Sequence, residues 1–467
     1  MLPKKRNDVS LWRKLAVAAA LGIGAWLLLV PPPAGIDPKA WAGTGLAVVT
    51  IGLWATAALP EFVPALLLFL IAMLWKLAPA SVVFSGFAAS ALWLVFGGML
   101  IGQAVGRSGL GARLARFVAP LFGTGQAGLV GGVMALGLVL AFLMPSSMGR
   151  IMLAMPIVLA LADRVGYAPS GNGRAALVLA LVFGSFLLSF SILPANIPPM
   201  VMVGAAETLY GWTPLYGQYL LLLFPVLTLV KGGLAFWLIL KFFPQVPLLT
   251  DAPAEAAKPW SRDEIVLASI LGGALLLWVT DFVHHVSPAW IALGAGLLCI
   301  LPGIKLIPPE EVGRRVSWEQ LVYVAGVLSI GAIIEHVGLG RILGQALLGL
   351  APLEPGASGT AYATMVGTTA VVALATTLPG APAVMTPLAG PLAEAAALPV
   401  ETLMMAQLVG VSCLLLPYQG PPMVVGLAQG GVALSRATPV VLAIGLISLV
   451  LLAPLQWLYW RLLGFLP

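Results

Sequence analysis

Long apolar runs, separated by short polar or proline-containing segments, follow one another along almost the whole chain. About 20 apolar residues in a helix are enough to cross the hydrocarbon core of a bilayer. The pattern therefore predicts an all-α integral membrane protein with about 11 transmembrane helices. We expect these helices near residues 15–31, 42–59, 61–78, 88–107, 175–209, 214–243, 264–282, 287–303, 319–337, 402–434 and 437–464.

Two further apolar stretches are each interrupted near the middle. Residues 125–166 are broken at Met144–Gly149, and residues 359–398 are broken at Leu378–Pro382. Each arm is short for a full crossing of the bilayer, and an interruption at membrane depth must be shielded from lipid. The two stretches therefore predict two re-entrant hairpins with their tips at the interruptions.

The motif Leu-Pro-x-x-x-Pro-Pro-Met-Val occurs twice, at Leu193–Val201 and at Leu416–Val424. Proline has no backbone N–H, and its ring clashes with the carbonyl four residues earlier, so each copy breaks its helix and frees backbone carbonyl groups. Such loose backbone is tolerated inside a bilayer only where it faces protein or water. Two breaks at matching places in two halves indicate the binding site of a transporter.

The order of helix, hairpin, broken helix and helix occurs twice, on either side of a polar, proline-rich linker at residues 244–263. Four spans precede the first hairpin, and three separate the linker from the second. The odd extra span inverts the second copy relative to the first. We therefore expect two inverted-topology repeats, residues 1–243 and 264–467.

Composition supports a membrane protein, since 60% of the residues are hydrophobic and only 9% are charged, whereas about 25% are charged in a typical soluble domain. The net charge of +6 comes from basic residues scattered singly between apolar runs. It therefore indicates topology and not a nucleic-acid partner. We expect a protein of the inner (plasma) membrane with a cytoplasmic N-terminus and an external C-terminus. This topology leaves few basic residues outside, namely Lys39, Lys76, Arg341 and Arg461.

The chain lacks the common catalytic motifs. H-E-x-x-H, G-x-S-x-G and a Walker loop do not occur. The two cysteines, Cys299 and Cys413, lie in apolar segments and provide neither a disulfide framework nor a metal-binding spacing. We therefore expect a protein that is not an enzyme and that uses no cofactor apart from a coupling ion.

Three features resemble the divalent anion/sodium symporter family (solute carrier family thirteen) of the ion-transporter superfamily. They are the paired Pro-Pro breaks, the Gly-Leu-Gly turns at Gly109–Gly111 and Gly338–Gly340, and the segment Ala141–Tyr167. The resemblance covers nearly the whole chain and implies a homodimeric elevator transporter whose tips and breaks bind anion and sodium together. It implies a moving part, residues 88–209 and 319–434, and a scaffold, residues 1–87, 214–243, 264–318 and 437–467.

Several side chains at the expected site differ from the family pattern. Ser146-Ser147-Met148 stands at the first tip, where family members carry Ser-Asn-Thr, and Gly380-Ala381-Pro382 stands at the second. The Asn that follows Pro-Pro in the family is replaced by Met200 and by Met423. Much of the polar lining is therefore exchanged, while the backbone of the site is expected to persist.

The candidate site combines helix ends with a few polar side chains. Helix N-termini carry partial positive charge and unpaired N–H groups, so four half-helix ends can hold a small anion. The predicted substrate-binding residues are Ser146, Ser147, Arg150, Asn196, Pro198, Thr377, Gly380, Ala381, Gln419, Gly420 and Pro421. For sodium, the resemblance implies binding at Ser146, Ser147, Thr376, Thr377 and the backbone of Ala195 and Tyr418.

Other interpretations of these side chains stay open. The tip serines could cap the following half-helix, and the threonines could bond back to their own helix. Asn196 and Gln419 could satisfy loose backbone instead of reaching substrate. Arg150 could bind the anion directly, replace a coupling cation, or pair with backbone carbonyls. Lys231 is expected to pack or snorkel within the scaffold.

These features predict a secondary active transporter of a small anion, sulfate-like or dicarboxylate-like, that is coupled to a cation and works by alternating access through an elevator motion. An antiporter or exchanger of the wider superfamily, moving an ion or an oxyanion, is the alternative. A membrane enzyme or assembly factor with a transporter-derived fold is a third hypothesis. The expected partners are the small anion, the lipid bilayer and a second copy of the chain.

Overall fold

The structure is a computed structural model that describes residues 11–33, 37–56, 59–111, 113, 125–246, 259–350, 353–376 and 378–466. Within these residues every regular element is helical and none is a strand, which confirms the all-α prediction for this part of the chain. Five of the described helices are long and apolar enough to cross a bilayer: Gln126–Leu143, Asn172–Ser191, Tyr216–Phe242, Trp318–His336 and Leu434–Leu462. The count of about 11 transmembrane helices stays a prediction.

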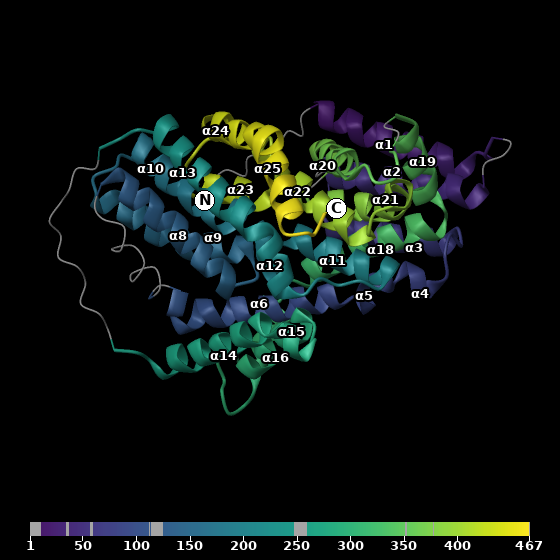
Figure 1. The fold of residues 1–467 in the computed structure, drawn as a ribbon. Coiled ribbons are helices and arrows are strands. Elements are labelled where there is room, and N and C mark those ends of the chain that lie inside the picture. The colour runs from purple at the N-terminus through teal and green to yellow at the C-terminus, as the bar shows by residue number, and fades with distance from the viewer. Residues whose placement is uncertain are drawn as a thin grey trace.

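The first half of the chain supplies the purple to teal elements of Figure 1. They are α1 (Leu11–Leu29), α2 (Pro38–Thr56), α3 (Phe62–Leu74), α4 (Ala80–Val83), α5 (Ser85–Ala88), α6 (Ser90–Ser108), α8 (Gln126–Leu143), α9 (Ser147–Arg164), α10 (Asn172–Val182), η2 (Phe183–Leu187), η3 (Leu188–Ser191), η4 (Leu193–Ala195), α11 (Ile197–Tyr210), α12 (Tyr216–Phe224), η5 (Pro225–Val230) and α13 (Lys231–Phe242).

The second half supplies the green to yellow elements. They are α14 (Arg262–Val279), α15 (Asp281–His284), α16 (Pro288–Ile300), α17 (Pro309–Arg315), α18 (Trp318–His336), α19 (Leu339–Leu350), α20 (Ser358–Ala375), α21 (Gly380–Ala396), α22 (Val400–Ser412), η6 (Pro417–Gln419), α23 (Pro421–Gln429), α24 (Leu434–Ile447), η7 (Ser448–Leu452) and α25 (Ala453–Leu462).

Both Pro-Pro motifs interrupt a helix, as the sequence predicts. In the first half, α10 loosens into the π turn η2 and the 3-10 turns η3 and η4 before α11 begins at Ile197. In the second half, α22 ends at Ser412, and α23 begins at Pro421 after the short turn η6. Pro194 and Pro417 explain the loss of helical hydrogen bonding directly before each break, because a proline cannot donate to the carbonyl four residues earlier.

Each interrupted apolar stretch forms a helix–turn–helix pair. Helices α8 and α9 contact each other, as do α20 and α21. The first connection lies at residues 144–146, at the predicted tip. The described residues between α20 and α21 are 376, 378 and 379, beside the predicted second tip. That these pairs enter and leave the bilayer on one side stays a prediction.

The two halves also share a local irregularity. Each has a π-helical segment inside the long helix that follows its break, η5 after the first motif and η7 after the second. The number of residues from the start of the motif to the start of the π segment is the same in both halves. It runs from Leu193 to Pro225 in the first half and from Leu416 to Ser448 in the second. This match supports an internal repeat at the level of single turns.

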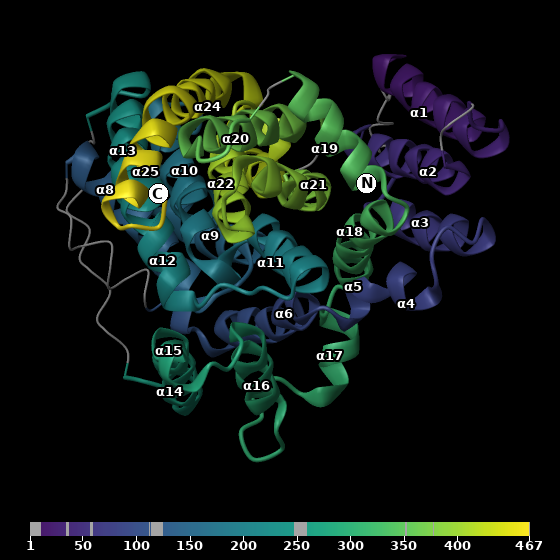
Figure 2. The ribbon, with the colours of Figure 1, turned by 45° about the vertical axis from the view of Figure 1, so that its right-hand side comes forward.

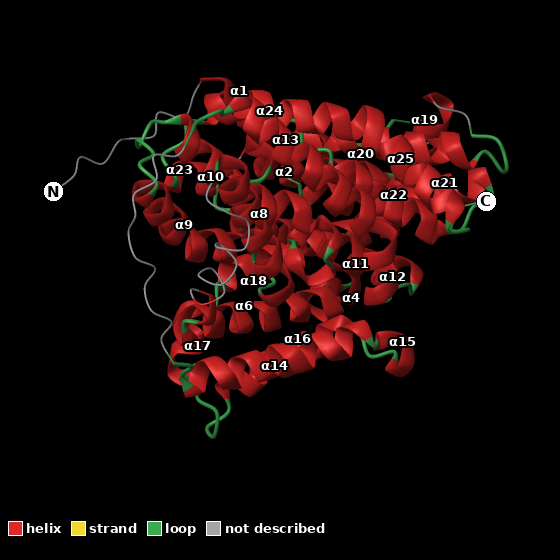
Figure 3. Cartoon of the chain, turned by 60° about the vertical axis from the view of Figure 1, so that its left-hand side comes forward, coloured by secondary structure: helices red, strands yellow, loops and turns green. Residues whose placement is uncertain are grey.

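Elements of the two halves pack into one another. Helices α8, α9, α10 and α13 share a hydrophobic core with α23 and α24, and these elements lie together in Figures 1 and 2. A larger core joins α2, α3 and α6 to α16, α18, α21 and α22. Figure 3 shows α14 and α16 as a layer beside α6. The division into scaffold and moving part stays a prediction.

Candidate functional site

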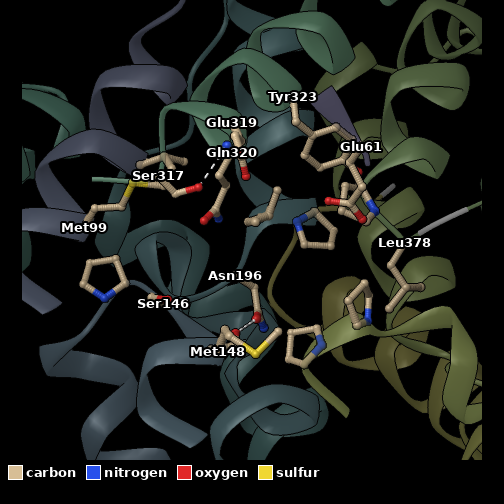
Figure 4. Close-up of a pocket in the computed structure, with 18 of the residues that line it drawn as sticks. Glu61, Met99, Ser146, Met148, Asn196, Ser317, Glu319, Gln320, Tyr323 and Leu378 are labelled. Carbon is tan, nitrogen blue, oxygen red and sulfur yellow. Dashed lines mark hydrogen bonds between the residues drawn. The ribbon is translucent and has the colours of Figure 1, made fainter. Parts of the chain in front are cut away.

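A cavity of about 300 Å³ lies where the two tips and the two breaks meet. Its lining includes Pro145–Met148 at the first tip and Ala195–Pro198 at the first break. Leu378 and Pro379 line it from the second tip, and Pro421 and Pro422 from the second break. Four segments far apart in the sequence thus share one small cavity (Figure 4). Its volume lies at the lower end of the range for small-molecule sites.

Six of the described helices begin at this cavity, and four of them belong to the tips and the breaks. Helix α9 begins at Ser147, α11 at Ile197, α21 at Gly380 and α23 at Pro421, and each starts at or beside a residue of the lining. Every N-terminus carries roughly half a positive charge, and the N–H groups of a first turn lack intrahelical acceptors. The four ends together favour an anion in the cavity, with few polar side chains needed.

The opposite wall of the cavity carries acidic groups. Glu61, which precedes α3, and Glu319 of α18 line it together with Gln320 and Tyr323, and Figure 4 shows Glu319 and Gln320 across from Asn196. Nothing in the sequence indicated this wall, because both carboxylates lie near helix ends where solvent exposure is the usual expectation. One wall of the cavity therefore carries the helix ends of the tips and the breaks, and the other carries two carboxylates at the beginnings of α3 and α18.

Arg150 lies directly behind the first tip and is completely buried. Its Nη2 lies 3.0 Å from the Ala195 carbonyl oxygen and 3.1 Å from the Ser147 and Ser189 Oγ atoms. Its Nε donates to the Ser185 carbonyl at 3.2 Å, and Nη1 donates to the Met144 carbonyl. The guanidinium is thus surrounded by oxygen atoms of the tip and the break, and it is absent from the cavity lining.

The two amide side chains of the breaks bond to the protein itself. Asn196 donates through Nδ2 to the Phe186 carbonyl at 3.0 Å and to Ser189 Oγ at 2.8 Å. Gln419 accepts through Oε1 from the backbone N–H groups of Leu415 at 2.9 Å and Leu416 at 2.7 Å. Both amides satisfy loose backbone, and Asn196 also lines the cavity, whereas Gln419 does not.

Comparison with known proteins places this site in a family. Residues 9–466 match the family model described as the sodium:sulfate symporter transmembrane region. The chain belongs to the sodium:sulfate symporter family. The predicted membership of the divalent anion/sodium symporter family is therefore confirmed.

Two relatives carry a transporter name, and a third is named only as a membrane protein. The L-tartrate/succinate antiporter of Shigella dysenteriae serotype 1 (strain Sd197) is 24% identical over 495 residues, which cover 94% of this chain and 96% of the relative. The L-tartrate/succinate antiporter of Escherichia coli (strain K12) is 24% identical with the same coverage. A membrane protein of Cupriavidus necator is 23% identical, in a match that covers 72% of this chain and 69% of the relative.

A solved structure shares the fold. The Alcanivorax borkumensis YdaH transporter, whose structure is described as having an unusual topology, matches with a TM-score of 0.54 at 17% identity. The match covers 82% of this chain and 88% of that chain. Family and relatives together identify a multi-pass membrane protein that transports anions and point to a transporter rather than an enzyme.

The sodium ligands expected from the family fit a sodium ion poorly at the first tip. The Ser147 hydroxyl donates to the Ala195 carbonyl at 3.1 Å, and both oxygens also accept from Arg150. Ser146 caps α9 by accepting from the Gly149 N–H at 3.1 Å. A fixed guanidinium among these oxygens would repel a second cation.

The second half offers fewer candidate sodium ligands. Thr376 donates back to the Val372 carbonyl of its own helix at 2.9 Å. The Tyr418 hydroxyl donates to the Leu374 carbonyl at 3.1 Å, and sodium binding by the Tyr418 backbone stays a prediction. Thr377 lies outside the described residues.

The predicted substrate-binding residues fall into two groups. Ser146, Ser147, Asn196, Pro198 and Pro421 line the cavity. Others lie beside it or behind it and do not line it, namely Arg150, Gly380, Ala381, Gln419 and Gly420. Sequence reasoning missed the acidic wall and Met99, because nothing in their local pattern separates them from ordinary helix positions.

Proposed function

We propose that this protein is a secondary active transporter that binds one small dianion in the central cavity and carries it across the membrane by alternating access. The observation that carries the proposal is the meeting of four helix N-termini at one cavity of about 300 Å³. Such an arrangement suits an anion, because the helix dipoles and first-turn N–H groups act on the same bound group.

A dicarboxylate is the substrate class that the relatives favour. Relatives that cover nearly the full chain are named for L-tartrate and succinate, both four-carbon dianions. The two carboxylates of such a molecule can each face helix ends from a different half of the chain. Sulfate is the second candidate, since the family description names it.

We further propose an elevator movement in a homodimer of the inner membrane, with α12–α13 and α24–α25 travelling with the tips. Helices α13 and α24 share a core with α8, α9 and α10. Buried side chains add to this packing: Thr228 donates to the Leu188 carbonyl at 2.7 Å, and Gln456 donates to the Leu222 carbonyl at 2.7 Å. These contacts support a larger moving part than the sequence predicts.

A cross-link tests this assignment. Cysteines introduced as Leu188→Cys and Thr228→Cys, joined by a short bifunctional reagent, are expected to leave transport intact, because η3 and η5 would move together. Loss of transport on cross-linking, with full recovery when a cleavable reagent is cut, would show that the two elements move apart.

Transport itself is tested with purified protein in liposomes. Uptake of radiolabelled succinate, L-tartrate and sulfate is measured into liposomes. The liposomes contain one of these anions, or sodium, or neither. We expect uptake of at least one of these dianions. A folded, correctly inserted protein that takes up none of them, and whose thermal unfolding none of them shifts, would contradict the proposal.

A matched pair of substitutions tests the cavity. Met148 lines the cavity, whereas Met152, one turn further along α9, is 49% exposed and does not line it. Met148→Trp fills the cavity and is expected to lower uptake by about tenfold or more, since substrate placement is sensitive to small displacements. Met152→Trp is expected to retain uptake. Equal effects of the two substitutions would place the anion elsewhere.

A further inference from the structure

The two carboxylates of the acidic wall make no capping bond at the start of their own helices. Glu61 occupies the N-cap position of α3, and its side chain makes no hydrogen bond to the first turn. At the start of α18 the cap is Ser317, whose hydroxyl accepts from the Gln320 N–H at 3.2 Å. Glu319 lies in the first turn after that cap. Neither helix therefore uses its carboxylate as a cap.

Both carboxylates also lack a partner elsewhere in the described part of the chain. No ion pair or hydrogen bond joins the side chain of Glu61 or Glu319 to another described residue. Both side chains are exposed and line the cavity. An ionised carboxylate can only accept hydrogen bonds. Each of these groups therefore needs donors from water or from a molecule bound in the cavity.

The two walls of the cavity complement opposite kinds of chemical group. The wall of the tips and the breaks carries the N-termini of α9, α11, α21 and α23, which favour anionic acceptors. The acidic wall carries acceptors that favour donors, and Figure 4 shows Glu319 and Gln320 of this wall across from Asn196. A molecule that fits both walls has carboxylates on one side and hydrogen-bond donors on the other.

Succinate satisfies only one of these walls. Between its two carboxylates it has CH₂ groups, which cannot donate a hydrogen bond to Glu61 or Glu319. Water displaced from these carboxylates by a CH₂ group is a loss, because its hydrogen bonds are not replaced. L-tartrate, which together with succinate names two of the relatives, has a hydroxyl group on each of its two central carbons. Those hydroxyl groups can replace the displaced water.

We infer that Glu61 and Glu319 accept hydrogen bonds from hydroxyl groups of the substrate, so that the cavity selects a hydroxylated four-carbon dicarboxylate over succinate. This inference rests on the proposed function and specifies the substrate class of the same cavity. A hydroxyl group, unlike an ammonium group, leaves the substrate a dianion, as the four helix ends favour. Because both carboxylates are exposed, solvent and salt screen their repulsion of that dianion.

Competition in liposomes tests this inference. Uptake of radiolabelled L-tartrate is measured with unlabelled L-tartrate, succinate or 2,3-difluorosuccinate as the competitor. Difluorosuccinate carries polar C–F bonds at the positions of the hydroxyl groups but has no donor there. We expect L-tartrate to reach half-inhibition at a concentration about tenfold lower than either of the other two, since a hydrogen bond to a charged group stabilises by about 1.5–3 kcal/mol.

Three results would overturn the inference and leave the proposed transport function standing. The first is L-tartrate that competes no better than succinate or difluorosuccinate. The second is uptake of succinate or sulfate by a protein that does not take up L-tartrate. The third is L-aspartate as a stronger competitor than L-tartrate, which would assign the acidic wall to an ammonium group.

Variants of the two carboxylates test their roles separately. Glu61→Met and Glu319→Met remove the acceptor at similar side-chain length, and each is expected to lower the preference for L-tartrate over succinate by about three- to tenfold. Glu61→Gln and Glu319→Gln keep one acceptor oxygen and should retain more of the preference. A structural role, or simple repulsion of the anion, would change both affinities together. An unchanged ratio in the methionine variants would therefore overturn the inference.

Glu310→Met is the matched control. Glu310 is an exposed carboxylate in the first turn of α17 and does not line the cavity. We expect this variant to keep both the rate of uptake and the preference for L-tartrate. If a methionine variant of the acidic wall fails to fold, as judged by size-exclusion chromatography, the competition experiment on the unmodified protein still decides the inference.

Discussion

At the scale of single residues, the side chains of the breaks mainly compensate for backbone that the prolines set free. Asn196 bonds to the Phe186 carbonyl, to Ser189 and to the Ser147 hydroxyl. Gln419 bonds to two backbone N–H groups and, through Nε2, to the Ala373 carbonyl at 2.8 Å. A buried backbone group without a partner is costly, so these amides are needed to keep each break in one conformation.

Replacement of Asn196 is expected to destabilise the protein. Asn196→Ala removes the amide's hydrogen bonds to the Phe186 carbonyl and to Ser147 in a site where Asn196 is 3% exposed. We expect a loss of about 0.5–1.5 kcal/mol for each hydrogen bond removed, seen as a lower midpoint of thermal unfolding in detergent. The exposed Gln218 provides the control, and Gln218→Ala should change the midpoint little. Similar shifts for both variants would refute a structural role for the Asn196 amide.

At the scale of elements, the ends of helices are fixed by local caps and by contacts from distant segments. Helix α14 begins with a capping box, in which Ser261 accepts from the Glu264 N–H at 3.1 Å and Glu264 accepts from the Ser261 N–H at 2.8 Å. Arg113 reaches the same carboxylate with two bonds, of 2.8 and 2.9 Å. Its guanidinium also lies 4.6 Å from the centre of the Trp260 ring. The cap thus ties α14 to the chain that follows α6.

Removal of the charge on Glu264 is expected to loosen this link. Glu264→Gln keeps the shape of the side chain but weakens its ion pair with Arg113, so the midpoint of thermal unfolding should fall. Asp263→Asn changes an exposed carboxylate of the same turn and should have little effect. A double-mutant cycle with Arg113→Met should show that the two losses are coupled, and strictly additive losses would contradict the pairing.

At the scale of the whole molecule, the two halves form one unit through contacts that cross the repeat boundary. Arg436 of α24 donates to the Ser170 carbonyl and to Asn172 Oδ1, both at 2.8 Å. Trp460 of α25 donates to the Leu222 carbonyl at 2.8 Å. Because both halves contribute to one cavity, neither half alone is expected to bind the anion.

The proposed orientation in the membrane is tested by cysteine labelling in whole cells. The native Cys299 and Cys413 are buried and should give little background. Val286→Cys, at an exposed position between α15 and α16, is expected to react with an impermeant maleimide added outside. Gly303→Cys, where a side chain would meet nothing within 4 Å, should react only after the cells are opened. The reverse pattern would invert the proposed topology.

The sequence by itself determined the properties that depend on neighbours along the chain. Run length and composition specify membrane-type helices, because a helix satisfies its own backbone hydrogen bonds and needs only an apolar exterior. Proline acts on the carbonyl four residues earlier, so the residue order alone places both breaks, at Leu193–Val201 and Leu416–Val424. The repeated motif also indicated the location of the site and the family.

The tertiary structure decided what depends on segments that meet in space. Arg150 had three open interpretations in the sequence, and the structure shows it buried and bonded to backbone carbonyls of the tip and the break. Lys231 was expected to pack or snorkel, and the structure shows it buried and bonded to Ser412 of the other half. The acidic wall of Glu61 and Glu319 had no sequence signal. The physical reason is the same for Arg150, for Lys231 and for the acidic wall. The segments that surround each of these charged side chains lie far away in the sequence.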